Sequence, residues 1–159
     1  MKLFAISLLL VSTAVLAQSP AQTEFSQLKS LAGSWEGKTS QGAPVKIDYQ
    51  LTSGGSALMS TIHEHGDMIS MIHLDGPDKL LLTHYCSMGN QPRMVASASP
   101  DGKTITFKFL DATNLESPES GHMDNVVIAM AGPDHHTEQW NFSDHGKVVT
   151  EKFDLQRKK

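Results

Sequence analysis

Residues 94–110 have the sequence MVASASPDGKTITFKFL, in which two alternating segments flank the turn-forming triplet Pro100-Asp101-Gly102. In the second segment the apolar residues Ile105, Phe107 and Phe109 alternate with threonine and lysine, which is the two-residue period of a half-buried strand. Proline followed by aspartate and glycine favours a type I turn with the glycine in the left-handed conformation. The stretch therefore predicts an antiparallel hairpin whose second strand turns its three apolar side chains toward the core.

The same unit, a short alternating segment followed by a turn, recurs along most of the chain. The links between segments contain glycine, proline, asparagine or aspartate, and most have hairpin length, so they join antiparallel neighbours. An open sheet of about ten strands exposes two edges. We therefore predict an all-β fold, an antiparallel up-and-down β-barrel, with a flat or sandwiched sheet as the alternative. The expected strands are Trp35–Thr39, Val45–Leu51, Ala57–His63, Met68–Leu74, Leu80–Ser87, Met94–Ala98, Thr104–Leu110, Met123–Met130, His136–Phe142 and Val148–Gln156.

The first residues predict export. Met1-Lys2 provides a short basic start, residues 3–16 are mainly apolar, and Val15-Leu16-Ala17 resembles a signal peptidase site. We expect residues 1–17 to be a bacterial signal peptide that delivers the protein to the periplasm or the exterior. Residues 18–24 are expected to be a disordered lead-in. Residues 25–159 are expected to be one domain, in which a short helix over 25–31, ended by Gly33, closes one end of the barrel.

The composition excludes several partners. The chain has 13 Lys and Arg against 17 Asp and Glu, with no basic cluster except the closing residues 157–159, so nucleic acid and anionic membrane surfaces are not expected. Cys86 is the only cysteine, so no disulfide forms within the chain. It is either a small buried hydrophobic residue or a reactive or ligating thiol.

The two ends of the predicted barrel carry a family resemblance. Gly33-Ser34-Trp35 resembles the Gly-x-Trp opening of the calycins, which include lipocalins, fatty-acid-binding proteins and nitrobindins. The resemblance implies that Trp35 plugs the closed end and that Arg157, on the last strand, packs over it. Four further strings resemble an exported bacterial family of calycins without an assigned function: Leu82–Cys86, Gly89–Met94, Gly121–Met123 and Glu138-x-Trp140.

Turn geometry predicts which side chains face the barrel interior. A three-residue loop at 100–102 directs Arg93 inward, and a four-residue loop at 89–92 then directs His84, Cys86 and Met88 inward. The turn at 132–134 aligns Val126 and Ile128 with Trp140 and Glu138, and alternation on the last strand selects Val149, Glu151, Phe153, Leu155 and Arg157. The predicted ligand-binding residues are His84, Cys86, Arg93, His122, His136, Glu138, Trp140 and Glu151.

A buried arginine needs a partner, because an unpaired buried charge is costly. Two interpretations stay open for Arg93: an ion pair with Glu138 or Glu151 in a filled barrel, or the orientation of a polar or charged small molecule. Apolar walls with a few convergent polar groups are typical of ligand cavities, so small-molecule binding is the leading hypothesis.

Two other classes of function remain. A metal site is the second hypothesis, with His84, Cys86, His122 and His136 as candidate ligands beside the His63-x-His65 pair, and the nitrobindin resemblance implies haem as a variant of it. An enzyme that uses His84 as base and Cys86 as nucleophile is the third. Side chains two apart on a strand stand about 6–7 Å apart, too far for direct proton transfer. No catalytic residue is therefore predicted, and no esterase, zinc-protease or phosphate-loop motif occurs.

Overall fold

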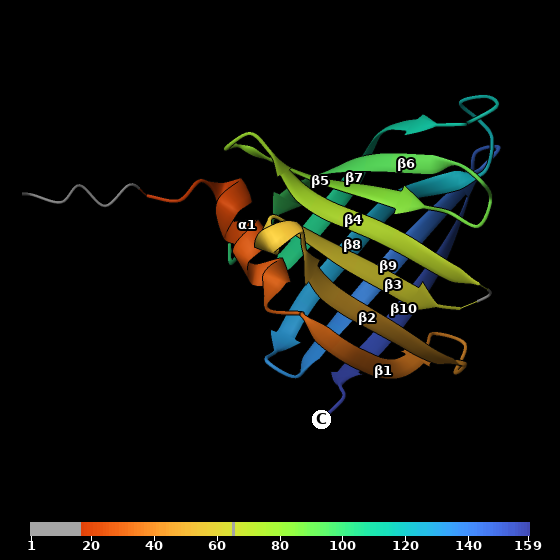
Figure 1. The fold of residues 1–159 in the computed structure, drawn as a ribbon. Coiled ribbons are helices and arrows are strands. Elements are labelled where there is room, and N and C mark those ends of the chain that lie inside the picture. Colours follow the sequence, from red (N-terminus) through yellow and green to blue (C-terminus); the bar gives the residue numbers. More distant parts are fainter. Residues whose placement is uncertain (1–16, 65) are drawn as a thin grey trace, which may run out of the picture.

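The computed structural model describes residues 17–64 and 66–159, which form a closed barrel of ten antiparallel strands (Figure 1). Each strand pairs with its sequence neighbours, and β1 also pairs with β10, so every strand is paired on both sides. The predicted all-β barrel is confirmed, and the flat or sandwiched alternative is wrong. The elements are α1 (Pro20–Lys29), β1 (Gly33–Thr39), β2 (Pro44–Thr52), the 3-10 turn η1 (Ser53–Gly55), β3 (Ala57–His63), β4 (Asp67–Asp75), β5 (Lys79–Tyr85), β6 (Gln91–Ala98), β7 (Thr104–Thr113), β8 (His122–Gly132), β9 (His135–Asp144) and β10 (Lys147–Arg157).

Two parts of the sequence-based predictions lie outside the described residues. All of the predicted signal peptide except Ala17 is outside them, and so is His65 of the His63-x-His65 pair.

Helix α1 begins at Pro20, so the prediction of a disordered lead-in over residues 18–24 is wrong. Ser19 is the N-cap: its Oγ accepts a hydrogen bond from the backbone N of Gln22 at 3.2 Å, and Gln22 Oε1 accepts from the backbone N of Ser19 at 2.9 Å. This capping box satisfies backbone groups that the first turn leaves unpaired. One face of the helix is then fixed by burial of Ala21, Phe25 and Leu28 in the core.

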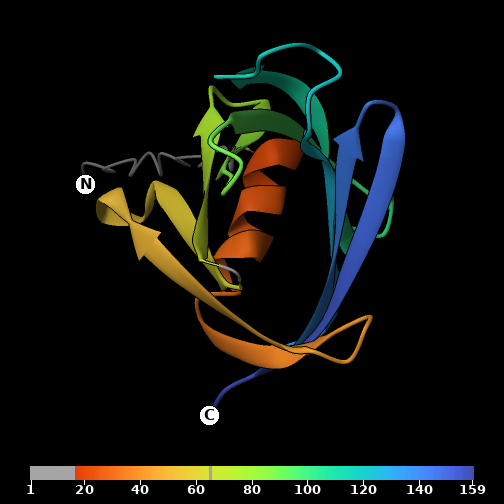
Figure 2. The same ribbon diagram turned by 90° about the vertical axis from the view of Figure 1, so that its right-hand side faces the viewer.

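The helix lies at one end of the barrel. It packs against β4, β5 and β6, and a view from the opposite end shows it behind the ring of strands (Figure 2). We call this the helix end, and the opposite end, with the loops after β1, β3, β5, β7 and β9, the rim end. Within the described part of the chain, no helix combines the length and the apolar character needed to cross a membrane.

Trp35 and Arg157 meet at the helix end. The Trp35 side chain is fully buried, its Nε1 donates to the Leu31 carbonyl oxygen at 2.7 Å, and the Arg157 guanidinium lies 4.3 Å from the centre of its ring. Arg157 also donates to two carbonyl oxygens just after α1, each at 2.8 Å. Gly33 has φ +127°, and a Cβ there would lie 3.0 Å from an Arg157 nitrogen. Arg157 therefore connects β10 to the segment between α1 and β1.

The β6–β7 hairpin differs from its prediction by one residue. The turn closes between Ser99 and Thr104, whose backbone atoms are bonded at 2.8 Å, so the loop has four residues instead of three. Asp101 stabilises the longer loop, because its carboxylate accepts from Ser99 Oγ and from the backbone N of Lys103. The pairs are consequently Ala98 with Ile105, Ala96 with Phe107 and Met94 with Phe109.

A one-residue shift turns the whole of β6 over. Met94 is fully buried inside the barrel, whereas Arg93 lies on the outer face and forms an ion pair with Asp111. The prediction that Arg93 points inward is therefore wrong. The inward prediction for β7 is not affected, and Ile105 and Phe107 are fully buried.

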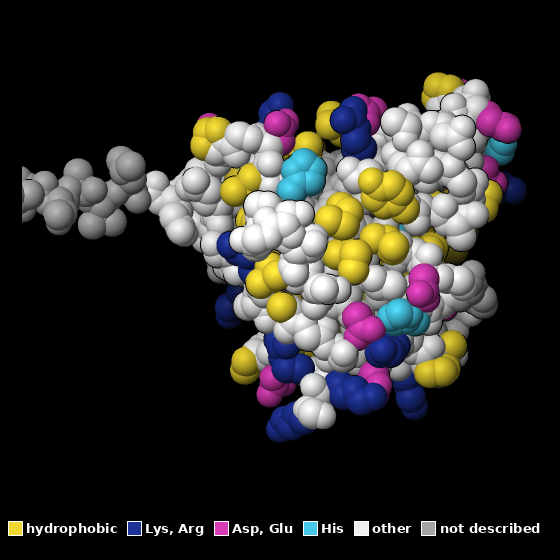
Figure 3. All heavy atoms as spheres, in the orientation of Figure 1, with side chains coloured by type: hydrophobic (Ala, Val, Ile, Leu, Met, Phe, Trp, Pro, Cys, Tyr) yellow, Lys and Arg dark blue, Asp and Glu magenta, His cyan; other side chains and the backbone are white. Residues whose placement is uncertain are grey.

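The outer face of β3, β4 and β5 is unusually apolar. Met59 and Met71 stand opposite each other on β3 and β4, and Ile69 and Leu81 add two more half-buried apolar side chains. Figure 3 shows hydrophobic side chains gathered on this face, between charged groups. Because both faces of β4 are apolar, its alternation alone does not identify the inward face.

The interior is sealed at the helix end and less covered at the rim end. Ile105 and Leu155, near the helix, have no exposed surface. Among inward-facing residues near the rim, Met68 and Phe109 are only half-buried, and Val149 is 62% exposed. The rim end is therefore the side from which solvent reaches the inner wall.

Candidate functional site

A row of polar side chains crosses the inner wall from β2 to β5. Tyr49 pairs with Ser60, Ser60 with Ser70, and Ser70 with His84, one residue from each of four successive strands. All four are buried, and apolar residues occupy the neighbouring inward positions, among them Ile47, Leu58, Ile72 and Leu82. Since all four positions follow the inward alternation of their strands, the row is part of the interior.

Glu138 on β9 faces this row and collects three hydrogen bonds. It accepts from the Tyr49 hydroxyl at 2.5 Å, from Trp140 Nε1 at 2.8 Å and from His136 Nε2 at 3.1 Å. The carboxyl group is 1% exposed, so these donors take the place of water. Burial, and next the negative charge of Glu138, raise the pKa of Tyr49 well above its usual 10, so the phenol stays protonated and donating.

His136 connects Glu138 to the closed end. Its ring meets the Trp35 ring edge to face at 4.2 Å, and it is fully buried. Because Nε2 donates to the carboxylate, the other ring nitrogen, Nδ1, is left without a hydrogen-bond partner among the described residues. His136 and Glu138 therefore belong to a packed polar core that continues from the Trp35 and Arg157 closure.

His84 has one bonded and one unpartnered ring nitrogen on the inner wall. It is fully buried, its Nδ1 lies 3.0 Å from Ser70 Oγ, and its ring lies 5.1 Å from that of Trp140. Its Nε2 has no hydrogen-bond partner among the residues that the structure describes. Burial lowers the pKa of His84 to about 4, so the imidazole is neutral at physiological pH.

The other predicted site residues lie away from this group. His122 is buried near the rim, where Nδ1 contacts the Ser120 carbonyl oxygen at 2.7 Å and the ring packs on Phe109. Cys86 follows the end of β5 and is half-buried, and Met88 beyond it is 63% exposed, so the inward register predicted for β5 ends at His84.

Glu151 lies at the rim, away from Glu138. Its carboxylate accepts from the backbone N and the hydroxyl of Ser40 and from the side chain of Gln41. The internal ion pair of Arg93 with Glu138 or Glu151 is therefore wrong, because Arg93 is outside the barrel. Of the predicted ligand-binding residues, the structure brings together His84, His136, Glu138 and Trp140.

The candidate metal ligands do not assemble. In residues 17–64 and 66–159, no group of three or more His, Cys, Asp or Glu side chains is placed to hold a metal ion. Among the described residues, two buried imidazole nitrogens lack a hydrogen-bond partner, Nε2 of His84 and Nδ1 of His136, and each could offer a metal or a haem iron one ligand at most.

Sequence reasoning missed three members of the interior: Tyr49, Ser60 and Ser70. Alternation from the apolar Val45 and Ile47 would have placed Tyr49 inward, since these residues share a face. The two serines carry no such signal, because small polar residues are usually expected on the solvent side of a strand.

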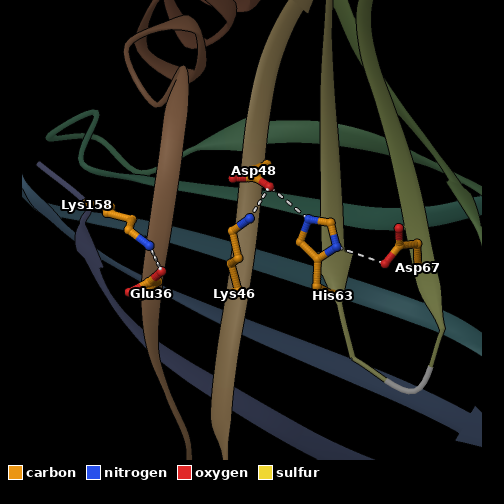
Figure 4. A network of polar contacts seen from close by, with 6 residues as sticks. All are labelled: Glu36, Lys46, Asp48, His63, Asp67 and Lys158. Carbon is orange, nitrogen blue, oxygen red and sulfur yellow. Dashed lines mark hydrogen bonds and ion pairs between the residues drawn. The ribbon is translucent and has the colours of Figure 1, made fainter.

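A second polar cluster lies on the outer face of β1 to β4 (Figure 4). His63 stands between two carboxylates, with Nε2 at 2.8 Å from Asp48 and Nδ1 at 2.8 Å from Asp67. Hydrogen bonds raise the pKa of His63, the one to Asp48 more than the one to Asp67. The pKa of Asp48 is lowered to about 2, mainly by its hydrogen bond from Lys46. Both ring nitrogens of His63 are thus engaged in ion pairs that tie β2, β3 and β4 together.

Comparisons with known proteins show only the fold. No family model and no curated protein matches the chain. Among solved structures it is similar to a protein of unknown function from the DUF3598 family of Nostoc punctiforme, with 12% sequence identity and a TM-score of 0.55. The match covers 84% of this chain and 49% of that one, so this chain spans about half the length of the protein it resembles. At 12% identity the similarity supports a shared barrel fold and says nothing about the chemistry of either protein.

Proposed function

We propose that this protein is an exported, calycin-like barrel that holds one small, partly apolar molecule in its interior. The observation that carries the proposal is the buried Nε2 of His84, which has no hydrogen-bond partner among the described residues. Leaving a buried polar group unsatisfied costs about 1–3 kcal/mol, and such groups are few in folded proteins. A ligand that bonds to this atom removes the cost.

The surroundings of His84 support the same proposal. Apolar walls from Leu82 and Met94 flank it, and the Trp140 ring stands beside it. A few oriented polar groups within apolar surface are typical of small-molecule sites. Entry through the rim end fits the partial exposure of the inward-facing Met68 and Phe109.

Native mass spectrometry of protein purified from its own cells tests the proposal, together with an absorption spectrum of the same sample. We expect a co-purified mass in the range of a small organic molecule, which is released when the protein unfolds. His84→Gln should reduce the amount retained, and His73→Gln, which changes a histidine on the outer face of β4, should not. Protein free of any bound mass, in wild type and variant alike, would contradict the proposal.

Export is tested separately, by the mass of the mature protein. We expect cleavage after Ala17, and such a product would retain Ser19 and the capping box of α1. A full-length chain recovered from the cytoplasm would refute export and leave the ligand proposal untouched.

A further inference from the structure

The charges of the inner wall bear on the class of ligand, and this inference rests on the proposed function. None of the buried residues that the structure describes is a lysine or an arginine. Arg93 pairs with Asp111 on the outer face, and Arg157 covers Trp35 at the helix end. A ligand anion beside His84 therefore meets no fixed positive charge.

The inner wall carries a negative charge instead. Glu138 bonds to Trp140 Nε1, and the Trp140 ring lies 5.1 Å from the ring of His84, so a single side chain links the carboxylate to the imidazole that carries the unpartnered nitrogen. The neutral His84 supplies no countercharge near pH 7, because burial holds its pKa at about 4. Like charges at low dielectric repel strongly, so a carboxylate is disfavoured both by this repulsion and by its own desolvation.

The hydrogen bond to Ser70 indicates which ring nitrogen of His84 carries the proton. The Ser70 hydroxyl is buried, and the only partner that the described residues offer its hydrogen is His84 Nδ1, at 3.0 Å. If Nδ1–H donated to the serine, the serine hydrogen would be left unpaired. Each arrangement pairs one donor, but an imidazole nitrogen is a stronger acceptor than a hydroxyl oxygen, so the stronger bond has Ser70 donating to Nδ1, which leaves the proton of the neutral ring on Nε2. The unpartnered atom is then a donor.

We propose that the barrel selects a neutral ligand with a carbonyl acceptor, such as a ketone, ester or amide, which accepts a hydrogen bond from His84 Nε2, and that it rejects carboxylates. Apolar walls suit an alkyl or ring body on such a molecule. The same nitrogen would bind a metal or a haem iron only in the opposite tautomer, with the proton on Nδ1, because a metal takes the free electron pair.

Two chain-matched probes test the selection by isothermal titration calorimetry at pH 7.5. Methyl octyl ketone and decanoic acid have the same number of carbons and differ in charge. We expect the ketone to bind at least about tenfold more tightly than the acid. His84→Leu, which removes the donor and keeps an apolar side chain, should weaken ketone binding about tenfold or more, and His84→Gln, which keeps an N–H donor, should restore part of it. His73→Gln is the matched control on the outer face and should bind as wild type does.

The tautomer is read independently from the ring ¹⁵N chemical shifts of His84 in the full-length mature protein. A protonated Nε2 whose shift moves on addition of the ketone supports the proposal. An unprotonated Nε2, or a Soret band in the absorption spectrum, overturns it in favour of a metal or haem ligand. Acid binding as tight as ketone binding overturns the selection and leaves small-molecule binding intact. If neither probe binds and no other molecule is retained, the proposed function falls with the inference.

Discussion

Acid should destabilise this protein through His84, and the size of the effect follows from its burial. The folded pKa of His84 is about 4, below the value of about 6.5 that a histidine has in an unfolded chain. Between these two values the unfolded chain binds a proton that the folded protein does not. The contribution of neutral His84 to stability is therefore complete above pH 6.5 and is lost as the pH falls from 6.5 toward 4.

The loss can be estimated from the two pKa values. Linkage gives about 1 kcal/mol at pH 6, about 2 kcal/mol at pH 5 and about 3 kcal/mol at pH 4. Full burial of the ring means that solvent screening reduces this little. His63 opposes the trend, because its raised pKa stabilises the fold as the pH falls, and its contribution is lost as the pH rises through that raised value. A comparison of two chains that both keep His63 cancels its effect.

Urea unfolding of wild type and His84→Gln across pH 7.5 to 4 is the assay. Glutamine keeps a polar side chain beside Ser70 and does not titrate, so the variant should lack the acid-dependent loss. The difference in unfolding free energy between the two proteins should shift in favour of the variant by about 3 kcal/mol across the range. Parallel profiles would refute the reasoning, since they would mean that His84 titrates alike in the folded and unfolded states.

Four further substitutions test the architecture by denaturant melts. Trp35→Ala should lower the unfolding free energy by about 3–5 kcal/mol, because it empties a fully buried site. The losses from Trp35→Ala and Arg157→Ala should be non-additive by about 1 kcal/mol in the double variant, since the two side chains touch. Additive losses would contradict the packing of Arg157 on Trp35 at the helix end. Gly37→Ala should lower the unfolding free energy by roughly 3 kcal/mol or more, because a Cβ there would lie 1.8 Å from the Asp154 carbonyl oxygen. An unchanged unfolding free energy would refute this close approach of β1 and β10. Arg93→Met should leave the unfolding free energy nearly unchanged, since its ion pair is exposed, and a large loss would return this arginine to the interior.

The barrel was predictable because its signal is repeated. Ile105 and Phe107 alternate with polar residues, and a wrong assignment there would bury a lysine, so only one face of β7 is acceptable. The turn at 132–134 also gave the correct pairs, with Val126 opposite Trp140 and Ile128 opposite Glu138. Where both a clear apolar face and a tight turn are present, local sequence determines which side chains face inward.

Strand β6 lacked the first of these signals. Met94, Ala96 and Ala98 form one face, and Val95 and Ser97 lie on the other, so hydrophobicity separates the two faces only weakly. Its register then depended on loop length alone. The side chains of Ser99 and Asp101 stabilise a four-residue loop through hydrogen bonds to the backbone. The residue types in the loop are compatible with both a three-residue and a four-residue turn, so composition does not predict which one forms.

That one-residue difference decides what chemistry the interior offers. With Arg93 inside, the barrel would hold a permanent cation suited to a carboxylate, and a fatty-acid-like ligand would follow. With Arg93 outside, the polar groups that remain near His84 are neutral donors and one negative carboxylate, Glu138, whose three acceptor bonds are already made within the protein. The buried charge is therefore bonded within the protein, and on the proposed function the unpartnered Nε2 of His84 is the group left to bond to a ligand. On the proposed function, loop length at this single hairpin is enough to change the charge of the ligand that the interior favours.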